Sequence, residues 1–208
     1  MLCAALAAAG GNAVAADEKP AWYGDLDAGR SHLNMQGSDL DGVFGRQGIT
    51  TGGTTLDRHE TTWGLNLGYR FNPNFGLEGG YIDFGKSAYS APATAPGTDL
   101  IQGRYRAHAW SLAPVGYLPL NRQWDLFGKL GLTSARAELS TASTTGATAP
   151  TGGSHTNAGW VFGGGTTFDF TRNVYGKLEL DRYSHVGDAG VTGKSNIDVL
   201  GAGIGVRF

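Results

Sequence analysis

A serine and a histidine lie side by side in the segment RYSHVGDAG, as Ser184 and His185, and Asp188 follows shortly afterwards. Serine, histidine and an acid can act as nucleophile, base and orienting group when their side chains converge. The segment alternates like a β-strand, in which neighbouring residues point to opposite faces. A serine two residues after the histidine would share its face, but that position is Gly187. We therefore predict that the chain is not an enzyme.

Metal, phosphate and nucleic-acid chemistry are not favoured either. The glycines at 163–165 could belong to a phosphate-binding loop, but they lie within a strand pattern rather than before a helix. The net charge is −2, so no basic excess favours nucleic acid. We expect no metal site and no cofactor, because ligand spacing is absent from the five histidines, which are His32, His59, His108, His155 and His185.

The charged residues recur instead at alternate positions of strand-like segments, and apolar residues occupy the positions between them. In the last segment, Arg207 and three glycines share one face. The other face is entirely apolar and consists of Leu200, Ala202, Ile204, Val206 and Phe208. The segments are about 9 to 12 residues long, which is the length that a tilted strand needs to cross a bilayer.

We interpret the apolar faces as lipid-facing and the charged faces as the interior of a barrel. A soluble β-sandwich also alternates, but its outward face is polar throughout. Here charges of both signs are mixed with glycine, which makes up 35 of the 208 residues and would leave room in a narrow, filled lumen. Aromatic residues gather near segment ends, as expected for girdles at two membrane interfaces: Trp22, Tyr23, Phe71, Tyr117, Trp124, Phe170 and Phe208.

Eight such segments predict an all-β fold, an eight-stranded antiparallel up-and-down transmembrane β-barrel. The segments are 21–31, 60–71, 75–87, 103–118, 123–138, 157–170, 173–185 and 196–208. Tight turns alternate with long connections rich in Gly, Thr, Ser, Ala and Pro, at 32–59, 87–102, 141–156 and 185–195. Short turns on one side and long loops on the other are typical of outer-membrane barrels, and an even strand number places both termini on the short-turn, periplasmic side.

The first residues are predicted to be removed on export. An apolar run of small residues ends in Ala13-Val14-Ala15-Ala16, before the charged DEKP, and resembles the cleavage region of a secretory signal. We predict a signal peptide at 1–16 and a single barrel domain at 17–208, located in the cell outer membrane of a Gram-negative bacterium.

The sequence resembles the OmpA-like outer-membrane barrels. The most specific match is LGYRFNPNFGLEGGYIDFG, a strand, an Asn-Pro turn and a second strand, and VGYLPLNRQWDLFGKLGL, FGGGTTFDFTRNVYGKLELDRY and the final GVRF extend it. The resemblance implies an integral outer-membrane protein with a polar, closed or nearly closed interior. It also implies that Phe208 is a recognition signal for the barrel-assembly machinery. The peptidoglycan-binding domain of larger members is expected to be absent.

In some members of this family, an inward glutamate and arginine exchange partners with a second Lys/Glu pair to gate conduction. The resemblance places Glu78 at the glutamate and Lys177 at the arginine, whereas the second pair falls on Pro114 and Thr167. A different network is therefore predicted, with Asp25 as the leading candidate for the partner of Arg207. Its members are Asp25, Asp27, Glu78, Arg106, Lys129, Lys177, Glu179, Asp181 and Arg207.

Three functions remain open at this point. The first is a structural barrel, expected to be a monomer, that supports envelope integrity, contacts outer-membrane lipid and lipopolysaccharide, and exposes its loops. The second is a narrow channel for ions or small solutes. The third is a surface adhesin or host-binding protein whose ligand binds the long loops, because loops on a rigid scaffold are common sites of recognition.

Overall fold

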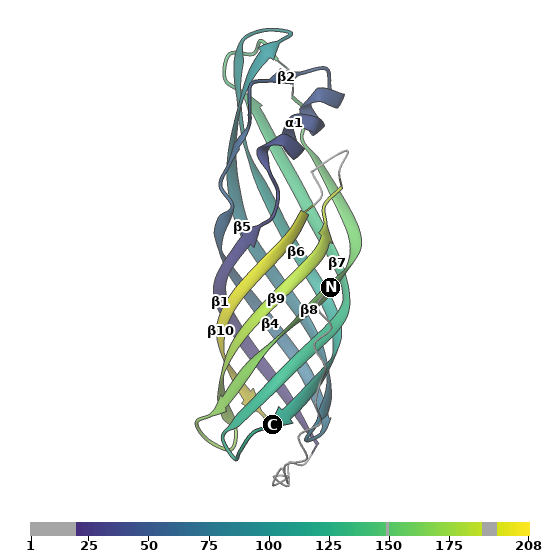
Figure 1. Ribbon diagram of the computed structural model, residues 1–208, viewed down its shortest axis with the longest axis vertical. Coiled ribbons are helices and arrows are strands. Elements are labelled where there is room, and N and C mark those ends of the chain that lie inside the picture. The colour runs from purple at the N-terminus through teal and green to yellow at the C-terminus, as the bar shows by residue number, and fades with distance from the viewer. Residues whose placement is uncertain (1–19, 149, 189–194) are drawn as a thin grey trace, which may run out of the picture.

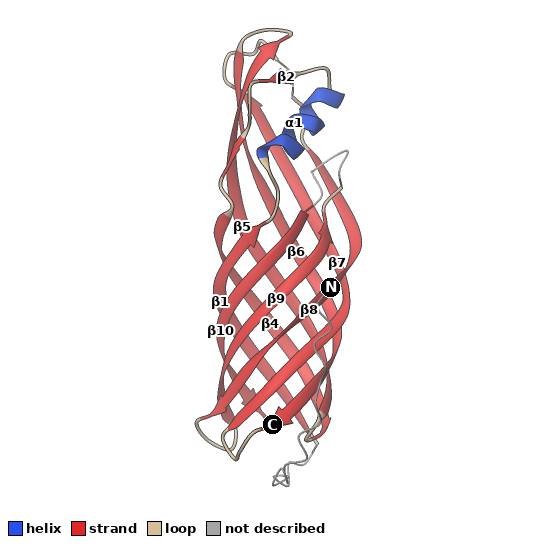
Figure 2. Cartoon of the chain, viewed as in Figure 1, coloured by secondary structure: helices blue, strands red, loops and turns tan. Residues whose placement is uncertain are grey.

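The structure is a computed structural model, and it describes residues 20–148, 150–188 and 195–208. The proposed signal peptide lies outside the described residues. Eight long strands form a tall barrel that carries one short helix, α1, near one end (Figures 1 and 2). No helix within the described ranges combines the length and the apolar character needed to cross a membrane.

The eight long strands are β1, β4, β5, β6, β7, β8, β9 and β10. They span Ala21–Leu33, His59–Asn72, Phe75–Ala95, Asp99–Pro119, Trp124–Ser143, Gly153–Asp169, Val174–Val186 and Ser195–Arg207, in that order. Two short strands, β2 (Thr50–Thr51) and β3 (Thr55–Leu56), pair with the outer part of β5. Helix α1 spans Gly37–Arg46 in the connection between β1 and β2.

The long strands pair antiparallel with their neighbours in the sequence, and β1 closes the ring on β10. Tyr23 lies opposite Arg207 and Leu33 lies opposite Ile197, so the closing register runs along the whole of β1. Closure leaves no long strand with an unpaired edge, which is the condition for a β-sheet to exist in lipid. The predicted architecture is confirmed.

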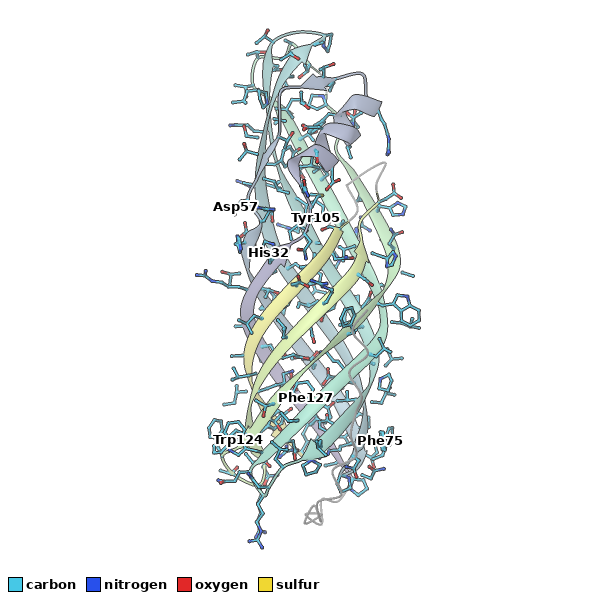
Figure 3. All side chains as sticks on the ribbon, in the orientation of Figure 1. His32, Asp57, Phe75, Tyr105, Trp124 and Phe127 are labelled. Atoms are coloured by element: carbon cyan, nitrogen blue, oxygen red, sulfur yellow. The ribbon has the colours of Figure 1, made fainter. Side chains whose placement is uncertain are left out.

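The short-turn end of the barrel, defined by the connections 73–74, 120–123 and 170–173, also carries the two ends of the described barrel. Trp124 and Phe75 lie at this end (Figure 3). An Asn side chain tightens two of the turns: Asn72 Oδ1 accepts from the Phe75 amide, and Asn121 Oδ1 accepts from the Trp124 amide.

The opposite end, which we call the extended end, departs from the prediction. Strands β5 and β6 have 21 residues each and β7 has 20, so they rise beyond β1, β9 and β10 (Figure 1). The predicted loop at 87–102 is therefore mostly strand, and the predicted loop at 141–156 lies partly in strands. The backbone of the Ala, Ser and Thr residues in this region pairs in the sheet like that of the apolar residues. Because these side chains differ little in hydrophobicity, the alternation typical of a strand was not visible in the sequence.

Helix α1 was also missed, because three glycines within it lower its helix propensity and 32–59 was interpreted as loop. Its apolar residues Leu40, Val43 and Phe44 follow a helical spacing and are buried, with the Phe44 ring 6.0 Å from that of Tyr89. The Gln36 amide donates to the Asp39 carboxylate at 2.8 Å, which caps the first turn. The helix thereby covers the apolar interior of the extended end.

The outer surface of the barrel carries an apolar band bounded by aromatic rings. Leu65, Leu112, Leu130 and Leu180 are each 55% or more exposed within the band. At the short-turn end, the exposed aromatic residues are Trp22, Phe71, Phe75, Trp124, Phe170 and Phe208, and at the other boundary they are Trp63, Trp110 and Trp160. Tyr23 and Tyr117, which were assigned to a girdle, instead point inward and hydrogen-bond each other at 3.0 Å.

Candidate functional site

The centre of the barrel interior holds a cluster of charges organised by two lysines. Lys177 on β9 contacts Asp25 at 2.6 Å, Asp27 at 2.8 Å and Glu179 at 3.0 Å. Its side chain is only 4% exposed, so the cost of burying its charge is offset by the carboxylates that contact it directly. Asp25 and Asp27 alternate along β1 and face the same side, which is how strand periodicity brings both to one cation.

Lys129 on β7 organises the second half of the cluster. It contacts Asp181 at 2.9 Å, Glu78 at 3.4 Å and the second oxygen of Glu179 at shorter range. Glu179 therefore bridges the two lysines, one carboxylate oxygen to each. We call the seven residues of this arrangement the lysine cluster: Asp25, Asp27, Glu78, Lys129, Lys177, Glu179 and Asp181.

Carboxylates outnumber lysines in the lysine cluster, and neutral donors add further hydrogen bonds, while Asp27 Oδ1 and Asp181 Oδ1 accept none from the described residues. The Tyr175 hydroxyl donates to Asp25 at 2.8 Å, and the Tyr23 hydroxyl donates to Glu78 at 3.0 Å. The Asn66 amide donates to both Asp25 and Asp27. A buried carboxylate that is held by ammonium and hydroxyl donors costs far less to bury than an isolated one.

Two further ion pairs lie in the interior between the lysine cluster and the short-turn end. Arg70 pairs with Asp125 at 2.8 Å and lies over the Tyr117 ring at 4.2 Å. Arg207 pairs with Asp169 at 2.7 Å and lies over the Tyr175 ring. Arg70, Asp125 and Asp169 were absent from the predicted network. Arg70 and Asp125 alternate with the outward apolar residues of their strands, and this is the signal that could have found them.

The partner of Arg207 corrects a specific expectation. Asp25 was the leading candidate because β1 pairs with β10, but Asp25 is bound by Lys177 and Tyr175. Asp169 meets Arg207 from the end of β8, although β9 lies between their strands. The curvature of a narrow barrel allows long side chains to meet across the lumen, so adjacency in the sheet does not determine the partner.

Arg106 was predicted in the lumen, and this is wrong. On β6 it lies on the same face as the exposed Trp110, whereas Tyr105 and Ala107, which are 2% and 1% exposed, point inward. Arg106 lies beyond the Trp110 end of the apolar band, where the outer face of the barrel is polar. An arginine on that polar face remains hydrated and has no desolvation cost. Its charge therefore did not indicate whether it points inward or outward.

The position assigned to the family's second cation also proves unsuitable. Pro114 points outward, and its neighbours Ala113 and Val115 are the inward residues of that stretch. Thr167 does face the lumen and is 5% exposed. The second lysine of the lysine cluster is instead Lys129, which enters from β7.

Glycines make room for the inward side chains. A Cβ atom on Gly163 would lie 1.9 Å from an Asp181 carboxylate oxygen, and one on Gly203 would lie 1.9 Å from Asp27. A Cβ atom on Gly68 would lie 2.2 Å from the Tyr23 ring. These glycines therefore leave the space that the inward charged and aromatic side chains occupy in the lumen.

The interior is filled along its length. The two internal cavities lined by members of the lysine cluster enclose only about 20 and 30 Å³, which is room for about one water molecule each. Towards the extended end, the interior becomes an apolar core beneath α1, formed by Phe84, Tyr89, Ile101, Tyr105, Ala107, Leu139, Tyr183 and Val199. The lysine cluster thus fills the lumen within the apolar band, and the apolar core beneath α1 fills it toward the extended end.

The serine considered as a nucleophile is engaged in the sheet. The Ser184 hydroxyl donates to the backbone oxygen of Trp160 at 3.1 Å and accepts from its amide, so it is engaged within the sheet. His32 and His59 face each other across β1 and β4 with ring nitrogens 3.0 Å apart. Among the described residues, no group of three or more His, Cys, Asp or Glu could hold a metal ion.

A second polar centre lies at the tip of the extended end. The Asp99 carboxylate accepts hydrogen bonds from the Ser143 hydroxyl, the Thr145 amide, and the amide and hydroxyl of Thr148. The Ser143 hydroxyl, followed by the Thr145 and Thr148 donors, holds the pKa of Asp99 well below its usual range. Asp99 thereby anchors the connection between β7 and β8 to the start of β6.

Comparison with curated proteins relates the chain to outer membrane protein A. It is 29% identical to that of Klebsiella aerogenes over 201 residues, covering 94% of this chain and 51% of the relative. It is 31% identical to that of Shigella flexneri over 158 residues, covering 72% of this chain and 41% of the relative. The chain therefore spans about half the length of the curated relatives it matches, or less.

Solved structures share the fold at low sequence identity. Neisserial surface protein A matches with a TM-score of 0.58 at 13% identity, covering 92% of this chain and all of that one. OprG of Pseudomonas aeruginosa matches with a TM-score of 0.57 at 13% identity, covering 91% of this chain and 97% of that one. Ail of Yersinia pestis matches with a TM-score of 0.54 at 17% identity, covering 92% of this chain and all of that one.

The model of the OmpA-like transmembrane domain matches residues 17–208, which is nearly the whole chain. The match agrees with the closed antiparallel ring and with the curated relatives of the barrel region. This chain belongs to the family of OmpA-like transmembrane domains and is an integral β-barrel protein of the outer membrane.

Proposed function

We propose that the barrel is a structural element of the outer membrane that supports envelope integrity without conducting solutes or catalysing a reaction. The observation that carries this proposal is the double closure of its interior. The bridge from Lys129 through Glu179 to Lys177 ties β7 to β9 inside the apolar band. The apolar core beneath α1 then closes the extended end.

The closure favours a structural role over a channel on physical grounds. Moving an ion through the lysine cluster requires breaking ion pairs whose members are less than a tenth exposed, and each broken pair leaves a buried charge. An ion would next meet Tyr89, Ile101 and Phe44, which offer no compensating charge. The filled eight-stranded barrel is the form that such a fold takes when it does not hold a ligand.

The proposal includes three partners or states. The barrel is inserted by the barrel-assembly machinery, which recognises the closing strand β10 and Phe208; Phe208 points outward and is 70% exposed. It functions as a monomer, because closure of β1 on β10 leaves no long edge for a second copy. Its apolar band contacts membrane lipid, and the charged surface beyond that band faces lipopolysaccharide.

Envelope integrity can be tested with a strain that lacks the protein. We expect deletion to increase sensitivity to detergent and to osmotic shock, and we expect the wild-type chain to restore resistance. A variant with Asp99→Asn, which changes only the tip of the extended end, should restore it equally well. A deletion strain with unchanged resistance would contradict the structural role.

Recognition at the cell surface is the second candidate, and the rigid extension of β5, β6 and β7 favours it. Ail, which shares the fold, has been solved in complex with the heparin analogue sucrose octasulfate. In this chain the tip is anchored by Asp99, so a ligand would meet an ordered surface. Deleting residues 144–152 should abolish binding to host cells if the tip carries recognition, and unchanged binding would refute that assignment.

A further inference from the structure

Three cations on the outer face of β5 and β6 have no partner among the described residues. Lys86, Arg104 and Arg106 all point outward beyond the apolar band. Within the described part of the chain, their side chains form no hydrogen bond and no ion pair. We call these three residues the outer basic cluster. Single unpaired cations are common on protein surfaces. Three that lie close together on adjacent strands repel one another, so this arrangement calls for a physical explanation.

The register makes this arrangement costly in the absence of an anion. Lys86 and Arg106 are direct cross-strand partners in the β5–β6 pair. Like charges at directly opposed positions destabilise a sheet. Arg104, two residues along β6, adds a third positive charge on the same face. An anion bound between them would convert this repulsion into attraction.

A β-bulge aims Lys86 at this position. Asp83 pairs with His108, but the next registered pair is Lys86 with Arg106, so β5 contains one extra residue between the two pairs. Gly85 adopts φ 86° there, a conformation that other residues rarely adopt. Lys86 is an odd number of residues from the outward Asp83 and would point inward in a regular strand. Bulges of this kind often re-aim a side chain at a functional site.

The acidic residues nearby, among them Glu60 beside Gly85, form no ion pair with the outer basic cluster in the described part of the chain. Glu138 lies opposite Arg106 on β7, but its carboxylate accepts from Arg136 at 2.9 Å. Asp83 accepts from the Gly85 amide at 2.8 Å. Asp57 borders the groove beside Arg104 and forms no ion pair with it among the described residues.

The height of the cluster places it at lipid headgroups. Arg106 precedes the boundary residue Trp110, which is 64% exposed, by four positions along β6, and so lies on the side of the extended end. Four residues of strand at a tilt of about 45° rise about 9 Å, which reaches from the edge of the hydrocarbon into the headgroup layer. The phosphates of a membrane lipid are held at this height, so they meet the cluster wherever the barrel is inserted. A soluble anion is not confined to this height.

An open groove continues from the outer basic cluster toward the tip. It runs over the outer faces of β5, β6 and β7, and small or hydrogen-bonding side chains line it, among them Ser90, Gln102, Arg104 and Ser140. Hydroxyl and amide groups with little side-chain bulk suit the hydroxyls of a sugar. A ligand with a phosphate at the membrane and sugars above it matches the cluster and the groove together.

We propose that Lys86, Arg104 and Arg106 bind the phosphate groups of a phosphorylated glycolipid of the outer leaflet, lipopolysaccharide, whose sugars lie in the adjoining groove. The bulge at Gly85 sets Lys86 and Arg106 as two arms around one phosphate, and Arg104 reaches a second phosphate or the first sugars. This site is independent of whether the lumen conducts.

The test measures binding of bis-phosphorylated lipid A to the folded protein in phosphatidylcholine nanodiscs. The variant Lys86→Gln with Arg106→Gln should bind at least tenfold more weakly, because it loses two charge-assisted contacts. The control Arg122→Gln with Arg172→Gln removes the same charge from exposed short turns and should bind like wild type. The charge-conserving Lys86→Arg with Arg106→Lys should retain most of the affinity. Heat-modifiable migration establishes that each variant is folded.

Four results would overturn the proposal. The first is unchanged binding of lipid A by the Lys86/Arg106 variant, and the second is an equal loss in the short-turn control. The third is equal affinity of the wild-type protein for dephosphorylated lipid A. The fourth is a Lys86/Arg106 variant that loses affinity for sucrose octasulfate, used as a soluble sulfated probe, but not for lipid A. The last result would instead assign the cluster to a soluble sulfated ligand. A steep fall of lipid A affinity with salt, reduced in the Lys86/Arg106 variant, is expected in addition.

Discussion

Lys177 lies with its Nζ 2.6 Å from the carboxylate of Asp25, so residues 152 positions apart in the sequence share one ion pair in the barrel interior. Lys177 is on β9 and Asp25 is on β1, and β10 lies between them in the sheet. The pair therefore joins β1 to β9 across β10, independently of the backbone ladder that closes the ring. Charge pairing and strand pairing reinforce the same closure.

Glu179 is expected to be the most sensitive member of the lysine cluster, because it serves both lysines. Glu179→Gln removes a charge that both Lys129 and Lys177 contact and leaves two buried ammonium groups with fewer partners. We expect a loss of about 2 kcal/mol or more in unfolding free energy, measured by urea unfolding in lipid vesicles. Glu138→Gln, which breaks the exposed pair with Arg136, should cost less than about 1 kcal/mol. Equal costs would contradict the role of Glu179 as a bridge.

Gly163 tests how tightly the lumen is filled. In Gly163→Ala, the new methyl group would meet the Asp181 carboxylate and the Leu180 backbone oxygen, 2.5 Å away. Backbone cannot move aside cheaply, so we expect slower folding and a lower melting temperature by circular dichroism. Gly128→Ala is the matched control, because it faces outward and its methyl group would meet only the Gly163 backbone oxygen at 3.8 Å. If both variants melt alike, the lumen has more room than the structure shows.

The strand pattern was predictable because facing in a strand depends only on the neighbouring residues. The outward set from Leu200 to Phe208 is a case in which parity alone gives the correct face. Parity alone would place Lys86 inward, because the bulge that changes its facing is not visible in the alternation. Charge was misleading at Arg106, which lies beyond the apolar band. The pairing of Arg207 with Asp169 depends on how strands are staggered across the lumen, which no single strand encodes.

The anchor at Asp99 predicts a dependence on pH at the extended end. Because folding lowers the pKa of Asp99, its stabilising effect is complete above the ordinary aspartate pKa of about 4 and is lost as pH falls below it. Hydrogen exchange at the Thr145 and Thr148 amides should therefore accelerate in acid, after correction for intrinsic rates. In Asp99→Asn these amides should exchange fast at all pH values. Protection that persists unchanged in the variant would show that other contacts hold the tip.

Phe208 tests the proposed recognition by the assembly machinery. Its backbone already pairs with Trp22 in both directions, so the exposed ring is not needed for pairing. We expect Phe208→Ala to slow insertion into vesicles that contain the assembly machinery by about tenfold, with little effect on spontaneous folding in detergent. Phe170→Ala, another exposed girdle aromatic, is the control. Equal slowing of both variants would attribute the effect to the girdle rather than to the signal.

The central claim is that the interior is closed, and single-channel recording in planar bilayers tests it most directly. Protein that shows heat-modifiable migration should insert without discrete current steps, because the lysine cluster and the apolar core beneath α1 block the lumen in succession. Adding Lys129→Gln should leave the bilayer silent, because the apolar core remains. Reproducible conductance steps in the wild-type protein, altered in size or duration by Lys129→Gln, would contradict the account.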